Sequence, residues 1–338
     1  IYAYTFYRLF HSAEEVHMIY TTASDQGKAG EKSRYIQQMM VEMGIEMKEE
    51  IVYVPIDLKN TDAISISKTP EVLNLLERYV VTAEGFSQTS FSPSALSVYL
   101  DCRLKFYLQY LANIQEKDEV KEEIDAAVFG NIAHYSMEFL YDGFRKRKNR
   151  DVLEKRDFED LRKNWVFPSI ELGVRKFYHL EENADTKLSG QMAIVRDVMQ
   201  KYMVRLLEID EEDAPFRLVS MEKAHKAQFE INTVSGIKKI SLKGYIDRVD
   251  EKEGTIRLID YKSGGDKKVF SNVQSLFDRD DKNRNKAAMQ TMYYGLLYQA
   301  MHPENSKPLK PALFNFKEIF KEDFNPYLKN KEQKSEVQ

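Results

Sequence analysis

The sequence contains a single cysteine, Cys102, among its 338 residues. An intramolecular disulfide is therefore excluded, and the composition fits a reducing compartment. No apolar run approaches the roughly 18 residues that a membrane-spanning helix needs, and no signal-peptide pattern opens the chain. We therefore predict a cytoplasmic protein without a membrane segment.

A phosphate-binding loop of the form Gly-x-x-x-x-Gly-Lys-Ser/Thr is also absent. Such a loop cradles the phosphates of ATP with backbone N–H groups and a lysine, so this chain alone is not expected to hydrolyse ATP. An excess of positive charge is lacking too, because 50 Lys and Arg residues face 54 Asp and Glu residues, a net charge of −4. Any contact with nucleic acid must then depend on a local group of basic residues.

Two apolar, β-branched runs, residues 242–249 and 255–262, predict a β-hairpin. The segment between them is polar, and Gly254 readily takes the positive φ of a tight turn. A turn at this point places Asp247 opposite Asp260, with their Cβ atoms roughly 5 Å apart.

Lys262 shares a face with Asp260, because side chains alternate along a strand. The two carboxylates, Asp247 and Asp260, repel each other unless a cation lies between them. Two acids and a lysine are the minimum set for a metal-dependent phosphodiesterase. The same residues also fit an ordinary exposed hairpin with alternating charges.

Helical patterns flank the hairpin in the sequence. Residues 126–140 form an amphipathic run that contains His134, and Lys286 to Ala300 form a second one. Gln290 and Tyr294 lie four residues apart on one face of the second helix. A lone histidine on an apolar helix is more often a core residue than a ligand, so the order of the segments carries more weight than any one of them.

At this point the chain resembles the RecB/AddB-like branch of the PD-(D/E)XK nucleases. The family pattern is Gly-x-x-x-His, Gly-x-x-Asp-Arg-x-Asp, Asp-Tyr-Lys-Ser/Thr-Gly and Gln-x-x-x-Tyr. The matching segments here are Gly130–His134, Gly244–Asp250, Asp260–Gly264 and Gln290–Tyr294. The family's opening signature also fits from Phe91 onward, where Ser92 suits a helix N-cap and Pro93 the first helical position.

The resemblance implies an α/β fold with a restriction-endonuclease-like (PD-(D/E)XK) core, in which helices flank a mixed central β-sheet. It also implies a small N-terminal α/β segment. We predict a helicase-derived remnant over residues 1–65, a linker helix over 66–90 and a RecB-like nuclease domain over 91–338.

The N-terminal segment resembles the end of an AddB-type, inactivated superfamily-one helicase. Strands are expected at residues 15–20 and 51–56, on either side of a capped amphipathic helix within 30–41. Alternatively, these residues simply pack on the nuclease as an α/β cap. The start at Ile1 rather than Met suggests a piece of a longer chain.

Carried over from the family, the metal ligands would be His134, Asp247, Asp260 and the backbone carbonyl of Tyr261. Glu222, on the strand-like run before the hairpin, is a weaker candidate. Oxygen ligands suit Mg²⁺, and the imidazole makes Mn²⁺ an equal expectation.

The resemblance also assigns roles around the metal. Lys262 would position or deprotonate the hydrolytic water and stabilise charge on the phosphate. Gln290 and Tyr294 would shape the site and contact the DNA backbone. Apart from the resemblance, the position of Lys243 near the acidic hairpin predicts that it draws in phosphates.

Many relatives use a cysteine at the position of Cys102, with three more after the Gln-x-x-x-Tyr helix, to bind an iron–sulfur cluster. No second cysteine occurs here, so no iron–sulfur cluster is expected within these residues. Cys102 is instead predicted to be a small buried apolar side chain.

We therefore expect a Mg²⁺- or Mn²⁺-dependent deoxyribonuclease, an exonuclease module of a helicase–nuclease that processes DNA ends in recombination and repair. Its partners would be DNA and a helicase subunit or linked helicase domains. Two alternatives stay open: a catalytically silent nuclease-like scaffold that binds DNA or a partner subunit, and an endonuclease or RNA-processing enzyme with the same core.

Overall fold

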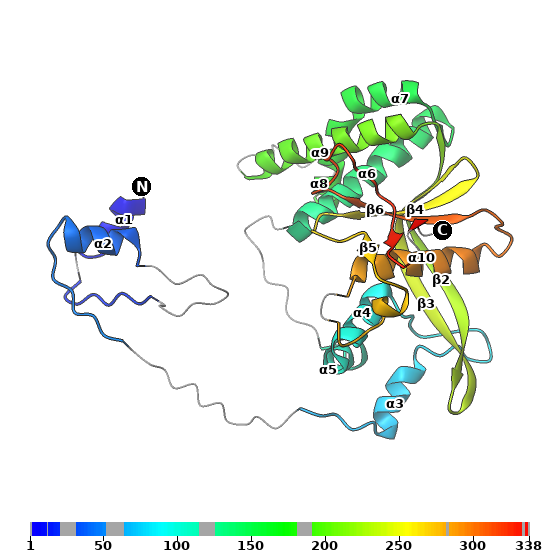
Figure 1. The fold of residues 1–338 in the computed structure, drawn as a ribbon, viewed down its shortest axis with the longest axis horizontal. Helices are drawn as coiled ribbons and strands as arrows, with labels where there is room; N and C mark the ends of the chain where they lie inside the picture. The colour runs from blue at the N-terminus through cyan, green and yellow to red at the C-terminus, as the bar shows by residue number, and fades with distance from the viewer. Residues whose placement is uncertain are drawn as a thin grey trace. The chain divides into compact units, whose positions relative to one another are not determined.

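The computed structural model describes residues 2–11, 13–20, 32–51, 64–114, 126–180, 191–281, 284–332 and 335–336. The chain divides into two compact units, Ile1–Ile64 and Ser65–Gln338. Each unit is described by itself (Figure 1). No helix among the described residues is both long and apolar enough to cross a membrane.

The N-terminal unit contains α1 (Tyr2–Arg8) and α2 (Arg34–Val41), which begins after its N-cap Ser33. The two helices contact each other, since the Tyr7 hydroxyl donates to Gln38 Oε1 at 2.7 Å. The predicted strand at residues 15–20 is wrong, because this run forms neither a helix nor a strand in the structure. The second predicted strand lies almost wholly outside the described residues.

A five-stranded sheet in the order β1-β2-β3-β4-β6 forms the centre of the second unit. The first four strands pair antiparallel, whereas β4 and β6 are parallel and are joined by a crossover that includes α10. The predicted mixed sheet is therefore confirmed. The strands are β1 (Val152–Leu153), β2 (Phe216–Thr233), β3 (Gly236–Lys252), β4 (Thr255–Lys262) and β6 (Leu309–Asn315).

Helices cover both faces of this sheet (Figure 1). Ile259 and Tyr261 of β4 pack in the apolar cluster of one helical layer, and Ile256 and Leu258 pack in the cluster of α10 on the other face. This alternation makes β4 a strand buried on both sides. One layer holds α6 (Ala126–Lys148), α7 (Lys155–Asp160), α8 (Val166–Phe177) and α9 (Gln191–Asp213), and the other holds α4 (Pro93–Asp101), α5 (Arg103–Phe106) and α10 (Lys286–Met301).

The helix starts follow the expected capping chemistry. Ser92 caps α4 by accepting a hydrogen bond from the backbone N–H of Ala95, and Asn285 caps α10 by accepting one from Ala288. The predicted burial of Cys102 is wrong, because this residue lies exposed at the junction of α4 and α5. Its Sγ accepts a hydrogen bond from the backbone of Lys105 at 3.4 Å.

Short elements complete the second unit. α3 (Pro70–Glu77) lies in the predicted linker, and the π-helical turns η1 (Tyr107–Leu111) and η2 (Leu161–Trp165) extend α5 and α7. A small second sheet has the order β5-β7-β8. Its strands are β5 (Val269–Phe270), β7 (Lys329–Asn330) and β8 (Ser335–Glu336), and a 3₁₀ turn, η3 (Gln274–Leu276), follows β5.

Candidate metal-dependent active site

The predicted hairpin is confirmed as β3 and β4, joined by a two-residue turn that ends at Gly254. Both turn residues have positive φ, 50° and 76°, as the twist of a tight hairpin requires. The last paired residues of the ladder are Arg248 and Ile259. One step further in the same register, Asp247 comes opposite Asp260.

Glu222 extends this row of acids to a third strand. The register between β2 and β3 on both sides of Glu222 places it opposite Asp247. Its φ of 41° lies in the left-handed region, which is uncommon for a residue other than glycine. Three carboxylates from three neighbouring strands therefore meet at one level of the sheet.

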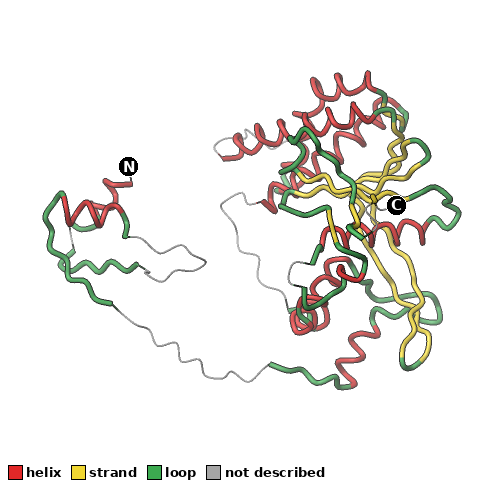
Figure 2. The backbone as a smooth tube through the Cα atoms, in the orientation of Figure 1, coloured by secondary structure: helices red, strands yellow, loops and turns green. Residues whose placement is uncertain are grey.

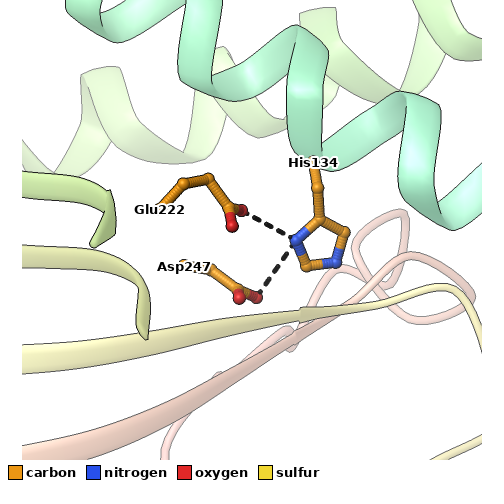
Figure 3. Close-up of side chains that lie close together, drawn as sticks. All are labelled: His134, Glu222 and Asp247. Atoms are coloured by element: carbon orange, nitrogen blue, oxygen red, sulfur yellow. Dashed lines mark hydrogen bonds and ion pairs between the residues drawn. The ribbon is translucent and has the colours of Figure 1, made fainter. Parts of the chain in front are cut away.

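His134 reaches these acids from α6 (Figure 3). Its Nδ1 lies 2.9 Å from Glu222 Oε1 and 3.4 Å from Asp247 Oδ2. Its Nε2 lies 3.2 Å from the carbonyl oxygen of Tyr261. One ligand atom from each of His134, Glu222 and Asp247 lies within 4.8 Å of the others, which is the geometry of a possible metal site.

Asp260 lies beside this group and not within it. Lys262 Nζ is 2.8 Å from Asp260 Oδ2 and donates to Gln290 Oε1 at 3.1 Å. Gln290 Nε2 in turn donates to Asp260 Oδ1 at 3.3 Å and to the Tyr294 hydroxyl at 2.6 Å. The Lys262 ammonium therefore neutralises the buried Oδ2, and no other group bonds this oxygen in the described part of the chain.

The electrostatics of the site are those of crowded acids. Burial raises the pKa of the Asp247 carboxyl well above its usual value, and the nearby Asp260 raises it further. Burial alone would lower the pKa of His134, but Asp247 and Glu222 outweigh it and raise this pKa to about 9. Burial likewise lowers the pKa of Lys262, and Asp260 more than reverses the effect, so the pKa is raised. The site thus attracts positive charge.

Two motif glycines allow the helices to approach the strands. A Cβ atom on Gly130 of α6 would lie 2.9 Å from Ser263 Oγ, directly after β4. A Cβ atom on Gly244 of β3 would lie 3.0 Å from both Tyr294 and Leu297 of α10. Both contacts are too short for a Cβ atom unless the neighbouring side chain moves. Glycine at these two positions therefore lets the helices lie close to the strands.

A second charged cluster, which we call the arginine cluster, lies beside the site and contacts α6 and α9. Arg248 is 0% exposed, and its guanidinium contacts Asp210 at 2.7 Å and Asp250 at 2.6 Å. It also donates to the hydroxyl of Tyr261 at 3.3 Å, so the cluster supports the residue whose carbonyl contacts the site. The members of the cluster are Arg248, Arg257, Asp210, Asp213 and Asp250.

The remaining predicted residues differ in their exposure to solvent and therefore in their access to DNA. Lys243 is exposed on β3, whereas Tyr294 is 4% exposed and Gln290 is half-buried. DNA contact by Gln290 and Tyr294 therefore stays a prediction. In the structure, Gln290 is hydrogen-bonded to Lys262, Asp260 and Tyr294. Glu222 contacts His134 more closely than its weak sequence signal suggested; only the pairing of β2 with β3 could have revealed this.

Comparisons with known proteins identify the family of the chain. The family model described as the PD-(D/E)XK nuclease superfamily matches residues 90–338. A relative from Streptococcus uberis, named as a subunit of an ATP-dependent helicase/deoxyribonuclease, is 26% identical over 175 residues, which cover 52% of this chain and 14% of the relative. Its namesake from Streptococcus agalactiae serotype Ia is 24% identical over 240 residues, 69% of this chain and 18% of the relative. The chain thus spans less than a fifth of the length of these relatives.

Proposed function

The chain belongs to the PD-(D/E)XK nuclease superfamily, and we propose that it is the metal-dependent DNA nuclease module of a helicase–nuclease. In this proposal it acts as an exonuclease that processes DNA ends in recombinational repair. The observation that carries the proposal is the meeting of His134, Glu222 and Asp247 within 4.8 Å, beside the ion pair of Asp260 and Lys262. The name of the relatives supports DNA as substrate and a helicase subunit or linked helicase domains as partner. The cytoplasmic location stays a prediction.

The donor set fits a divalent cation. Carboxylate oxygens are the ligands that Mg²⁺ prefers, and one imidazole among them also suits Mn²⁺. The crowding of buried Asp247 with Asp260 and Glu222 supports the same conclusion, because neighbouring carboxylates repel each other unless a cation lies between them. His134, Glu222 and Asp247 would hold the ion, with Asp260 and the Tyr261 carbonyl next to it. The ion would supply Lewis-acid polarisation of the phosphate and favour ionisation of water at neutral pH.

The side chains around the ion divide the remaining work. With its raised pKa, Lys262 is an ammonium group, which suits stabilisation of the charge that develops on the phosphate. Gln290 bonds to both Lys262 and Asp260 and so holds the pair in position, while Tyr294 fixes Gln290. Lys243, exposed on β3, is proposed to bind a DNA phosphate.

End-labelled linear DNA tests the proposal. The purified protein should degrade it with added Mn²⁺ or Mg²⁺, and Asp260→Ala should stop the reaction. Lys239→Ala is the matched control, because this lysine is exposed on β3 and paired with Glu230, away from the acids. Undiminished cleavage by the Asp260 variant, or in excess chelator, would reject the mechanism.

Calorimetric titration with Mn²⁺ separates the enzyme from a silent scaffold. The wild type should give binding heat that Asp247→Ala removes. A protein that binds DNA yet shows no Mn²⁺ heat dependent on Asp247 would be a scaffold.

A further inference from the structure

Beyond the acids, β2 and β3 continue as a long antiparallel ribbon (Figure 2). Val80 and Phe91 each form a single bridge to the outer edge of β3, at Ile240 and Leu242. β4 pairs with β3 only over residues 248–252, whereas the β2–β3 pairing runs on to Thr233 and Gly236. We call residues 224–233 and 236–245 the outer ribbon. Starting at the metal site, its successive cross-strand pairs on one face can be followed outward in register.

The first such pair after Glu222 and Asp247 is Ala224 opposite Tyr245. Tyr245 is 61% exposed. Its neighbour Gly244 faces α10, where a Cβ atom would lie 3.0 Å from Tyr294, so the tyrosine ring points away from α10. α6, which carries His134, lies on this other side of the sheet (Figure 1). The ring therefore stands on the His134 side, and the small Ala224 leaves the space across from it open.

The next pair on the same face is Lys226 opposite Lys243. Like charges directly opposite each other destabilise an antiparallel pair. Both side chains are exposed, and neither ammonium has an ion-pair partner in the residues that the structure describes. Further out on the same face, Lys239 lies opposite Glu230 and forms an ion pair with it at 3.5 Å. The charge of Lys239 is thus neutralised by Glu230, whereas the charges of Lys226 and Lys243, which lie nearer the acids, have no counter-charge among the described residues.

The spacing of these pairs matches an extended polyanion. Each step of two residues advances about 7 Å along a strand, so the ring lies about 7 Å and the lysine pair about 13 Å from the acids. An anion between the two lysines would remove their repulsion. A ring between phosphate sites offers a flat apolar face at the place where a base would lie.

We propose that the outer ribbon binds single-stranded DNA and leads it to the metal site. Lys226 and Lys243 bind its phosphates, and Tyr245 stacks on an unpaired base. A duplex cannot use the ring in this way, because its base faces are covered by their neighbours in the stack. The inference rests on the proposed nuclease function and names its substrate class.

Fluorescence anisotropy measures this binding with a labelled oligothymidylate about 16 nucleotides long. Ca²⁺ replaces Mn²⁺ to prevent cleavage, and a denaturing gel checks that the strand stays intact. Tyr245→Ala should weaken binding about 5- to 150-fold, the range for loss of one base–aromatic stack. Tyr245→Phe keeps the ring and should restore binding to within about twofold of wild type. A blunt duplex of equal length should lose less than about twofold on Tyr245→Ala.

The salt dependence of the affinity for single-stranded DNA tests the contacts of Lys226 and Lys243. The slope of log affinity against log salt concentration should decrease in magnitude by about 1.4 when both Lys226 and Lys243 become alanine, about 0.7 for each phosphate contact on a single strand. Lys239→Ala, on the same ribbon, should leave the slope unchanged. An unchanged slope in the double variant would overturn the lysine contacts.

Two further outcomes separate the inference from the proposed function. If the protein cleaves DNA with Mn²⁺ but Tyr245→Ala leaves its affinity for single-stranded DNA unchanged, the ribbon proposal alone is overturned. Equal losses on single strand and duplex would overturn it as well. Conversely, binding that depends on Tyr245 without any cleavage would overturn the nuclease function and support the ribbon as a single-strand site.

Discussion

The acids of the candidate metal site and the arginine cluster are neighbours along β3, where Asp247 directly precedes Arg248, and each group contains three carboxylates. In the arginine cluster, fully buried Arg248 bridges Asp210 and Asp250 through its guanidinium. In the candidate metal site, Asp260 pairs with the single ammonium of Lys262, and the positive charge nearest Asp247 is titratable His134. Permanent, forked cations therefore neutralise the carboxylates of the arginine cluster, whereas those of the candidate metal site face one lysine and one titratable imidazole.

The largest expected effect comes from Asp260→Asn, which keeps the shape and removes one charge from the metal site. Cleavage with Mn²⁺ should fall about 1,000-fold or more, because both the cation and Lys262 lose their charged partner. Stability in chelator should not fall, since one of the crowded carboxylates is gone. Cleavage rates and urea unfolding measure the two effects. A large loss of stability would show that this acid belongs to the framework.

Arg248→Met is the counterpart in the arginine cluster and should act through stability. It leaves Asp210 and Asp250 buried without their cation, a change that costs about 3–5 kcal/mol in the free energy of unfolding. Arg217→Met is the matched control, because Arg217 is half-exposed and pairs with Glu251 at the surface. That variant should lose less than about 1 kcal/mol in urea unfolding. Equal losses in the two variants would remove the distinction between the clusters.

The same contrast explains what the sequence could predict. The hairpin of Asp247 and Asp260 was predictable, because a glycine-containing turn and alternation along two short strands fix which side chains meet. The two helices were predictable from their apolar periodicity. These signals are local, and they place His134 and Gln290 in the right order along the chain.

Contacts between distant segments were not predictable in this way. Glu222 meets Asp247 only because β2 pairs with β3 through an irregular register near Leu218 and Ser220. Asp210 reaches Arg248 from α9, 38 residues away, and no local pattern indicates that pairing. A strand-like run such as residues 15–20 forms a strand only if it finds a partner strand, which the sequence alone does not reveal.

A dependence of stability on pH should distinguish the two clusters again. The folded-state pKa of His134 is about 9, above the usual value of 6.5, so its contribution is complete below about pH 6.5 and lost as pH rises through 9. In chelator, the free energy of unfolding should fall by about 3 kcal/mol over this window. The raised pKa of Asp247 acts in the same direction. The arginine cluster contributes nothing to this slope, because guanidinium groups stay charged.

Urea unfolding at several pH values checks this expectation. His134→Gln should flatten the profile, and saturating Mn²⁺ should reverse it, since a metal replaces the proton. A wild-type profile that is already flat, or one that the variant leaves unchanged, would contradict the role assigned to His134.

Gly130→Ala should have the smallest effect and should appear in metal affinity alone. The new Cβ atom would lie 2.9 Å from Ser263 Oγ, so the hydroxyl must turn away and lose its hydrogen bond to the carbonyl of Ala126. That loss of about 1 kcal/mol is offset by a gain of similar size in helix propensity, and stability in chelator stays level. Because α6 also carries His134, a small outward shift should weaken Mn²⁺ binding several-fold in calorimetry. Gly143→Ala is the control, because it gains the same helix propensity and its Cβ atom would meet only the flexible end of Arg147. An equal loss of Mn²⁺ affinity in this variant would show that α6 as a whole, rather than its contact with Ser263, sets the position of the His134 imidazole.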